Sequence, residues 1–474
     1  MSNPSPAASV SPAVAYLRTL PAVRERCSKI FNAASSEEGL KYFSYDASKE
    51  DAVADFCIDI IERDFGTDYA SIPPHGRWRH FDVGGIPRVT TLLSSWAGVH
   101  PSSPPSSAAS VAELAVDRVE AARRLVDLFM VSVLLDAGAG PSWKYEEKKT
   151  GLSYGRSEGL AVASLDMFTD GRFCGETSES ESRHKVDAAG LKNLSPDMLA
   201  IDMQVHPDSN PMTGLDGRTN LLVRLGEALE QDQFGFFAGP DTGSGATIPA
   251  TQRRPGFLVD YLAAHPTTRK SINVTEVSMP VLWEVLMYGL APIWPASRTH
   301  LDGVAMGDVW PNATLASLNH TSEDNEGAMV PFHKLSQWMC YSLQEAMEKT
   351  LGWRFVDAQH GTGLPEYRNG GLFVDLGVLT PTQALLDASS EKDAEIPGIP
   401  AEHPAIVEWR AMTVILLDRA ADKIRTKLGV GEDKLNLKQV LEAATWKGGR
   451  EIAKQKRPST GGPPINVISD GTVF

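Results

Sequence analysis

Glu366 and Arg368 place an acid and a base two residues apart in a segment rich in glycine. The segment, residues 360–378, reads His-Gly-Thr-Gly-Leu-Pro-Glu-Tyr-Arg-Asn-Gly-Gly-Leu-Phe-Val-Asp-Leu-Gly-Val. Such a sequence is a poor helix interior, because Gly and Pro favour tight turns, and glycine lets a substrate approach the backbone closely. We therefore expect a loop that holds charged groups against a packed core, which is a common way to build a site. The alternative is a buried Glu–Arg pair that braces a turn.

Asp136 is a second candidate carboxylate. It follows a long apolar stretch and is itself followed by Gly138 and Gly140, which are expected to end a helix. A carboxylate at a helix C-terminus is unfavourable to the helix dipole, so it needs a specific partner or a ligand such as a sugar hydroxyl. The alternative partner is Arg156 or another nearby base.

Three polar or aromatic side chains fall within about one turn of an expected helix: Lys334, Gln337 and Trp338. At this spacing a polar group and an aromatic ring can face the same cleft. A solvated lysine beside a buried tryptophan is the alternative. Arg410 lies in an otherwise apolar stretch, where charges are usually paired. We expect it to form an ion pair with an acid such as Glu366 or with a phosphate.

His75, His80 and Asp82 form an alternative, metal-binding constellation. A hydrolytic metal site needs nitrogen and oxygen ligands at fixed geometry, and the pair His80 and Asp82 could supply two of them. The spacing matches no recognised metal motif, and a further ligand would come from afar, from His184 or His333. A satisfied histidine beside a packed tryptophan is the competing interpretation.

Composition limits the class of partner. The chain has 474 residues, of which 42% are hydrophobic and 22% charged, and its formal net charge is −15. This charge argues against a general binder of nucleic acid or of an anionic membrane, although a few basic residues in a cleft can still bind a small anion. The four cysteines are scattered without metal or disulfide spacing. We expect a cytoplasmic protein without a membrane span, a secretory signal or a cofactor; its oligomeric state is left open.

The hydrophobic periodicity predicts a mainly α fold in one large domain, residues 1–474. Residues 1–12 are expected to be flexible, residues 100–110 to form an exposed Pro/Ser loop, and residues 457–474 to form an extended tail with a strand at 464–469. Short strands are expected at 272–277 and 372–374. Helices are expected at 13–32, 49–65, 111–135, 158–168, 215–230, 256–264, 279–288, 331–349, 381–387, 404–427 and 437–454.

Several of these segments together resemble the uracil-catabolism protein 4 family of fungi and bacteria, and they do so in one order along nearly the whole chain. The resemblance implies a role in a route that degrades uracil after its conversion to the ribonucleotide. In that route a cyclohydrolase-like partner is thought to open the ring and leave a ribosylurea-type product. The matching segments are Gly76-Arg-Trp-Arg-His-Phe, Asp136-Ala-Gly-Ala-Gly-Pro, Arg156-Ser-Glu-Gly-Leu, Gly214-Leu-Asp-Gly-Arg, Gly307-Asp-Val-Trp, Val330-Pro-Phe-His-Lys-Leu-Ser-Gln-Trp, Thr362-Gly-Leu-Pro-Glu-Tyr-Arg-Asn-Gly-Gly and Val407-Glu-Trp-Arg.

A fainter resemblance concerns chemistry. The order of segments is similar to that of the queuosine salvage proteins, helical N-glycosidases related in fold to helix–hairpin–helix DNA glycosylases. Glu366-Tyr367-Arg368, followed by Leu376-Gly377, looks like their acid-Tyr-Arg motif and the Leu-Gly pair after it. That family has Asp where this chain has Glu, and the extra methylene shifts the carboxylate by about 1.5 Å.

Both resemblances imply cleavage of a C1′–N bond, which needs a carboxylate near C1′ and groups that protonate or hydrogen-bond the leaving nitrogen. We expect Glu366 and Asp136 to be catalytic and a ribosylurea-type nucleoside or its 5′-phosphate to release urea. The alternatives are a metal-dependent amide or ring hydrolase and a non-enzymatic pathway partner. The expected substrate-binding residues are Glu158, Lys334, Gln337, Trp338, Tyr367, Arg368 and Arg410.

Overall fold

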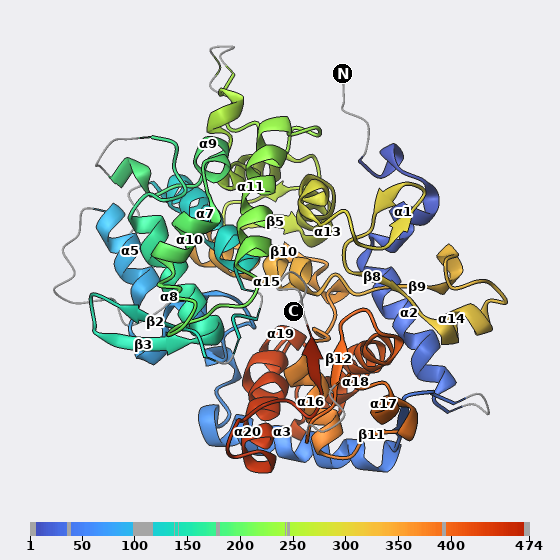
Figure 1. Cartoon of the computed structure of the whole chain (residues 1–474). Coiled ribbons are helices and arrows are strands. Elements are labelled where there is room, and N and C mark those ends of the chain that lie inside the picture. Colours follow the sequence, from blue (N-terminus) through green and yellow to red (C-terminus); the bar gives the residue numbers. More distant parts are fainter. Residues whose placement is uncertain are drawn as a thin grey trace.

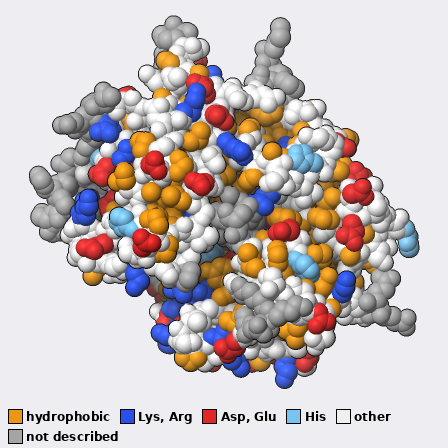
Figure 2. Space-filling model, viewed as in Figure 1, with side chains coloured by type: hydrophobic (Ala, Val, Ile, Leu, Met, Phe, Trp, Pro, Cys, Tyr) orange, Lys and Arg blue, Asp and Glu red, His pale blue; other side chains and the backbone are white. Residues whose placement is uncertain are grey.

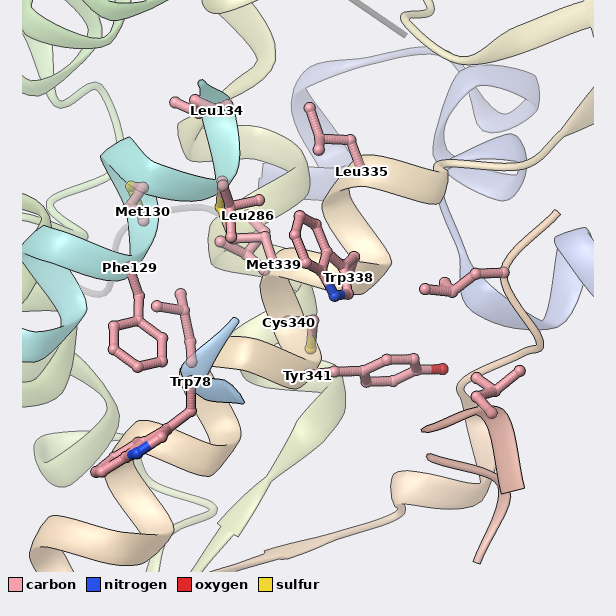
Figure 3. Close-up of a cluster of buried hydrophobic side chains, with 14 of the residues drawn as sticks. Trp78, Phe129, Met130, Leu134, Leu286, Leu335, Trp338, Met339, Cys340 and Tyr341 are labelled. Carbon is pink, nitrogen blue, oxygen red and sulfur yellow. The ribbon is translucent and has the colours of Figure 1, made fainter. Parts of the chain in front are cut away.

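Helices α7 (Arg118–Leu134) and α15 (Lys334–Leu351) pack against each other in the middle of the molecule (Figure 1). Both are buried on nearly all sides, as expected for helices in the centre of a large core. Figure 3 shows Phe129 and Met130 of α7 beside Met339 of α15. The ends of these two helices, the C-terminus of α7 and the N-terminus of α15, carry two of the predicted site residues.

The structure is a computed structural model, and it describes residues 6–35, 39–97, 117–136, 138–140, 142–176, 181–241, 243, 247–390 and 395–468. One hydrophobic cluster runs from Leu20 to Ile465, so both ends of the chain contribute to the same core. Figure 1 shows the blue helix α3 beside the orange and red helices α18 and α20. The helices are α1 (Pro12–Leu17), α2 (Leu20–Ala33), α3 (Glu50–Phe65), α4 (Trp78–Phe81), α5 (Arg88–Trp96), α7, α8 (Arg156–Thr169), α9 (Ala188–Lys192), α10 (Pro196–Asp202), α11 (Leu215–Gln231), α12 (Leu258–Ala264), α13 (Met279–Glu284), α14 (Ala313–Leu318), α15, α16 (Tyr367–Asp375), α17 (Gln383–Asp387), α18 (Pro404–Leu428), α19 (Leu437–Val440) and α20 (Trp446–Lys456).

The strands are short and join distant parts of the chain. Strand β1 pairs with β11, and β12 pairs in parallel with β13, which brings the C-terminal segment back onto the body of the protein. Strand β5 lies between β10 and β4. The strands are β1 (Phe43–Tyr45), β2 (Lys144–Glu147), β3 (Leu152–Gly155), β4 (Arg269–Lys270), β5 (Thr275–Ser278), β6 (His300–Leu301), β7 (Val304–Ala305), β8 (Val309–Pro311), β9 (Met329–Pro331), β10 (Trp353–Val356), β11 (Leu379–Pro381), β12 (Gly398–Pro400) and β13 (Asn466–Ile468).

The mainly α fold with a few short strands is confirmed, whereas the likeness to the queuosine salvage proteins stays a prediction. The strand expected at 372–374 is wrong, because those residues lie inside α16. The loop expected at 360–378 is likewise helical from Tyr367. Its glycines fit close contacts: a Cβ on Gly370 would lie 2.8 Å from the Trp409 ring, and one on Gly371 would lie 2.9 Å from Pro464. Tertiary packing thus outweighs the low helix propensity of glycine.

Two expected helices have different boundaries in the structure. The helix expected at 13–32 is divided in two, because the Thr19 side chain accepts the N–H of Ala22 and begins α2. The helix expected at 331–349 begins only at Lys334, after strand β9. The flexibility expected for residues 1–12 stays a prediction; the described residues 6–12 contain a short helical turn at Pro6–Ser9 and the first residue of α1. The expected loop at 100–110 lies outside the described residues.

The surface carries charges of both signs. On the face drawn in Figure 2, acidic and basic side chains are interspersed among apolar ones. None of the helices in the described ranges has the length and apolar character to cross a membrane.

Candidate active site

A cavity of about 350 Å³ lies where α7 ends and where α8, α15 and α16 begin. Its volume falls within the range of small-molecule sites. The cavity brings together six of the nine residues expected to be catalytic or substrate-binding, together with two of the expected metal ligands. Its charged, histidine and aromatic lining residues are His75, His80, Asp136, Arg156, Lys334, Trp338, Glu366, Tyr367, Arg368 and Trp446.

Glu366 is the N-cap of α16. Its carboxylate accepts the backbone N–H of Arg368 at 2.8 Å and that of Asn369 at 2.6 Å, and the residue is 7% exposed. Carboxylates at this position satisfy the free N–H groups of the first turn and complement the helix dipole. Because two donors hold it, the carboxylate has a fixed orientation in the cavity wall. The alternative of a Glu366–Arg368 pair that braces the turn is not what the structure has, because the Arg368 side chain donates to the Gly461 carbonyl at 2.8 Å.

Asp136 follows α7 directly and is paired with Arg77, not with Arg156. The Arg77 Nη1 lies 2.5 Å from the Asp136 carboxylate, and Arg77 is fully buried. Arg77 also donates to the hydroxyl and carbonyl of Ser132 and to the carbonyl of Ser157, so it links the end of α7 to the start of α8. This buried guanidinium offsets the unfavourable position of a carboxylate at a helix C-terminus.

Lys334 is the first residue of α15 and is buried, with 9% of its surface exposed. Burial lowers the pKa of its ammonium, while the carboxylates of Glu366 and Asp136 oppose this shift. Its backbone N–H donates to Asp308 at 3.0 Å. The residue before it, His333, has a left-handed backbone with φ of 49°, and its ring contacts the Leu17 carbonyl at 2.8 Å. The helix start that carries Lys334 is therefore held from both sides.

Arg156 begins α8 at the edge of the cavity. It is exposed, and its φ of 55° lies in the left-handed region that residues with a Cβ rarely occupy. Such strain is common at ligand-binding sites. Glu158, in the next half turn, is paired with Arg450 at 2.8 Å and does not line the cavity.

Besides Glu158, two further predicted binding residues lie away from the cavity. Arg410 forms a two-fold ion pair with Asp308, at 2.7 and 2.8 Å, and donates to the Pro365 carbonyl at 3.2 Å. Gln337 exchanges hydrogen bonds with Thr362 and is fully buried. Both side chains attach the 360–366 segment to helices α15 and α18, so they position Glu366 without facing the cavity. The sequence could not reveal this, because their partners are remote in the chain.

The histidine and aspartate constellation is not assembled. His75 and His80 line the cavity, but Asp82 accepts hydrogen bonds from the Trp78 ring and from the N–H of Val89. His75 is paired with Glu442 at 2.7 Å. The described part of the chain contains no group of three His, Cys, Asp or Glu side chains placed to hold a metal ion.

Aromatic rings form part of the cavity wall. Trp338 and Tyr367 were expected here, whereas Trp446 was not. The guanidinium carbons of Arg79 and Arg450 lie 4.2 and 4.8 Å from the centre of the Trp446 ring, within cation–π range. An aromatic ring backed by two cations can stack on a planar, electron-rich group of a ligand.

The C-terminal tail closes one side of the cavity. Thr460, Gly462, Pro463, Asn466 and Val467 belong to its wall, and β13 secures this segment to β12. The sequence predicted the strand but not its place at the site. The sequence analysis did not identify Arg77 as the partner of Asp136. Arg77 lies in the segment Gly76-Arg-Trp-Arg, where a basic residue next to a tryptophan could have indicated a buried cation.

A larger cavity of about 870 Å³ lies elsewhere, between α15 and the C-terminal part of α18. Its wall includes Glu348, Asp418 and Asp422, and none of the predicted site residues. By volume alone this larger cavity would be the candidate active site. The smaller cavity is favoured because carboxylates, a buried lysine and aromatic rings converge there.

A family model described as "Protein of unknown function (DUF1688)" matches residues 16–474. The chain belongs to this family. Within it, the chain is 41% identical over 472 residues to Uracil catabolism protein 4 of Lachancea kluyveri, which covers 97% of this chain and 99% of that protein. It is 40% identical over 462 residues to Protein urg3 of Schizosaccharomyces pombe, again covering 97% of this chain and 99% of that protein. The resemblance to the uracil-catabolism protein 4 family is thereby confirmed for this DUF1688 member.

Proposed function

We propose that this protein acts in uracil catabolism by hydrolysing the N-glycosidic bond of a ribosylurea-type nucleoside or its 5′-phosphate, with release of urea. The name of the Lachancea kluyveri relative supports the pathway. The observation that carries the chemistry is the shared cavity of Glu366, Asp136 and Lys334. Hydrolysis at C1′ needs a carboxylate and a proton donor in one water-restricted space, and these three side chains supply them.

Glu366 is the group that activates water. Its two backbone donors take one lone pair on each carboxylate oxygen, Arg368 N–H on Oε2 and Asn369 N–H on Oε1, so each oxygen keeps a lone pair for a water molecule. In the step, the C1′–N bond breaks and the water oxygen bonds to C1′. The proton of the water moves to Glu366, and the leaving nitrogen receives a proton from the Lys334 ammonium. A lysine with a lowered pKa suits this task better than an ordinary one.

Asp136 and Arg368 bind the sugar. Asp136 is oriented by Arg77 and can accept hydrogen bonds from ribose hydroxyls. Arg368 is the candidate ligand of a 5′-phosphate, and Arg156 lies at the rim of the same cavity. Arg410 is not assigned this role, because it already forms a bidentate ion pair with Asp308. Trp338 and Tyr367 contribute apolar walls that restrict water.

The test is urea release by the purified protein from synthetic ribosylurea and its 5′-phosphate. We expect Glu366→Gln to lower urea release by about 10²–10⁴-fold, the typical share of general acid–base catalysis. Glu408→Gln is the matched control: Glu408 also accepts backbone N–H groups, from Tyr42 and Phe43, but lies outside the cavity. Both variants should keep a cooperative thermal unfolding transition. Full turnover in folded Glu366→Gln would contradict the proposal.

A further inference from the structure

Two residues that line the cavity each carry a buried ring nitrogen without a partner among the described residues. Trp338 Nε1 makes no hydrogen bond within the described residues, although the side chain is only 5% exposed. His80 Nδ1 is likewise without a partner, and that residue is 2% exposed. A buried donor left unpaired costs about 1–3 kcal/mol, so native proteins seldom keep one without a reason.

The hydrogen bond at the other ring nitrogen defines the tautomer of His80. His80 Nε2 lies 3.0 Å from Arg79 Nη2, and arginine can only donate, so Nε2 must accept. Burial and the neighbouring cations, Arg79 first among them, lower the pKa of His80 well below its ordinary value. The imidazole is therefore neutral and carries its proton on Nδ1. The unpaired atom of His80 is thus a donor, as is the indole N–H of Trp338.

The two donors belong to neighbouring rings. The centres of the His80 and Trp338 rings are 5.6 Å apart, in an edge-to-face arrangement, and both residues line the cavity with Glu366. Two uncharged N–H groups suit an uncharged acceptor oxygen. An anionic group would instead be drawn to the arginines of the same cavity, Arg156 and Arg368.

We propose that His80 and Trp338 form a subsite for the carbonyl oxygen of a neutral urea-type group. The proposal rests on the proposed function for its chemical setting, where this carbonyl belongs to the ureido leaving group. As the C1′–N bond breaks, negative charge spreads from the nitrogen to the carbonyl oxygen. N–H groups that donate to that oxygen stabilise the charge, in the manner of an oxyanion hole. The two residues thereby select a ureido group over one without a carbonyl.

The test measures binding by the full-length protein, not turnover. In ligand-observed NMR titrations, methylurea offers the carbonyl oxygen, and methylthiourea has the same shape with a sulfur that accepts hydrogen bonds poorly. We expect methylurea to bind more tightly than methylthiourea. Trp338→Phe keeps an aromatic ring but removes the N–H, and His80→Phe keeps the ring contacts. Each should weaken methylurea binding about five- to tenfold, which corresponds to one hydrogen bond.

Trp78→Phe is the matched control. It removes an indole N–H that donates to Asp82 outside the cavity, so it should lower the thermal midpoint and leave methylurea binding unchanged. Trp338→Phe removes a donor that has no partner, so its thermal midpoint should fall less. Equal binding of methylurea and methylthiourea, no binding of methylurea, or unchanged binding by Trp338→Phe would overturn the subsite. If methylurea binding depends on Trp338 but ribosylurea is not hydrolysed, the subsite stands and the proposed function fails.

Discussion

At the scale of single residues, Lys334 combines a charge with burial. Burial lowers the pKa of its ammonium below that of an exposed lysine, so the unfolded chain holds this proton more tightly than the folded protein. Between the lowered pKa and the ordinary value near 10.5, the unfolded state binds more protons and stability rises with pH. Below the ordinary value the lowered pKa therefore reduces the free energy of unfolding.

We predict that Lys334→Met raises the free energy of unfolding at pH 7 and abolishes urea release. The stability difference should shrink as the pH approaches 10.5, because the lysine of the unfolded wild-type chain then also releases its proton. Denaturation by guanidinium chloride from pH 6 to 10 measures this; urea is unsuitable because it resembles the product. A variant less stable than the wild type at pH 7 would contradict the prediction.

Arg410 forms a buried ion pair with Asp308, and this pair determines its contribution to stability. Burial alone would raise the pKa of its partner Asp308, but the Arg410 guanidinium holds it well below its ordinary range. We predict that Arg410→Met lowers the free energy of unfolding by about 3–5 kcal/mol, because it leaves a buried carboxylate unpaired. Chemical denaturation measures the loss. The double variant Asp308→Asn with Arg410→Met should recover part of it; an additive loss would argue against a paired role.

At the scale of elements, the first turn of α16, which Glu366 caps, is closely approached by α20. A Cβ on Gly449 would collide with the carbonyl oxygen of Arg368, which belongs to the backbone of α16. We predict that Gly449→Ala destabilises the protein by about 1–3 kcal/mol and lowers kcat, because it displaces the turn that holds Glu366 and Arg368. Thermal unfolding and urea release measure the two effects.

The adjacent residue is the control for this element. A Cβ on Gly448 would lie 3.3 Å or more from the side chains of Phe56, Ile60 and Leu372, which can adjust. Gly448→Ala should therefore keep activity and change stability by less than about 1 kcal/mol. Equal behaviour of the two alanine variants would show that the close contact between α16 and α20 does not control the site.

At the scale of the whole molecule, the C-terminal tail completes a cavity built by helices far earlier in the chain. We predict that a chain ending at Arg457 raises KM for the substrate at least tenfold, because the truncation removes the wall that includes Asn466 and Val467. Ile465→Ala is the control: it should cost about 2–5 kcal/mol of stability, since Ile465 is fully buried, yet keep the wall and KM. Steady-state kinetics of both proteins distinguish an effect of lost core packing from an effect of the missing cavity wall.

The sequence predicted the helical class and most helices because their apolar residues repeat every three or four positions. It failed at α16, where Gly370 and Gly371 reduce helix propensity but allow contact with Trp409 and Pro464. It also named Asp136, Lys334 and Glu366 without showing that they face one cavity. Their types were informative, since carboxylates and a lysine in apolar surroundings need partners or ligands.

The helical class, the family and the residue types available for chemistry could all be predicted from the sequence, because these depend on local patterns and on the order of segments along one chain. The pairing of the charges, and the identity of those that face the cavity, became known from the folded structure. Arg410 is bound by Asp308, and Arg77 holds Asp136, whereas Lys334 and Glu366 line the cavity. The physical reason is that pairing depends on distances of a few ångströms between residues that are tens to hundreds of positions apart, and packing of the core sets those distances.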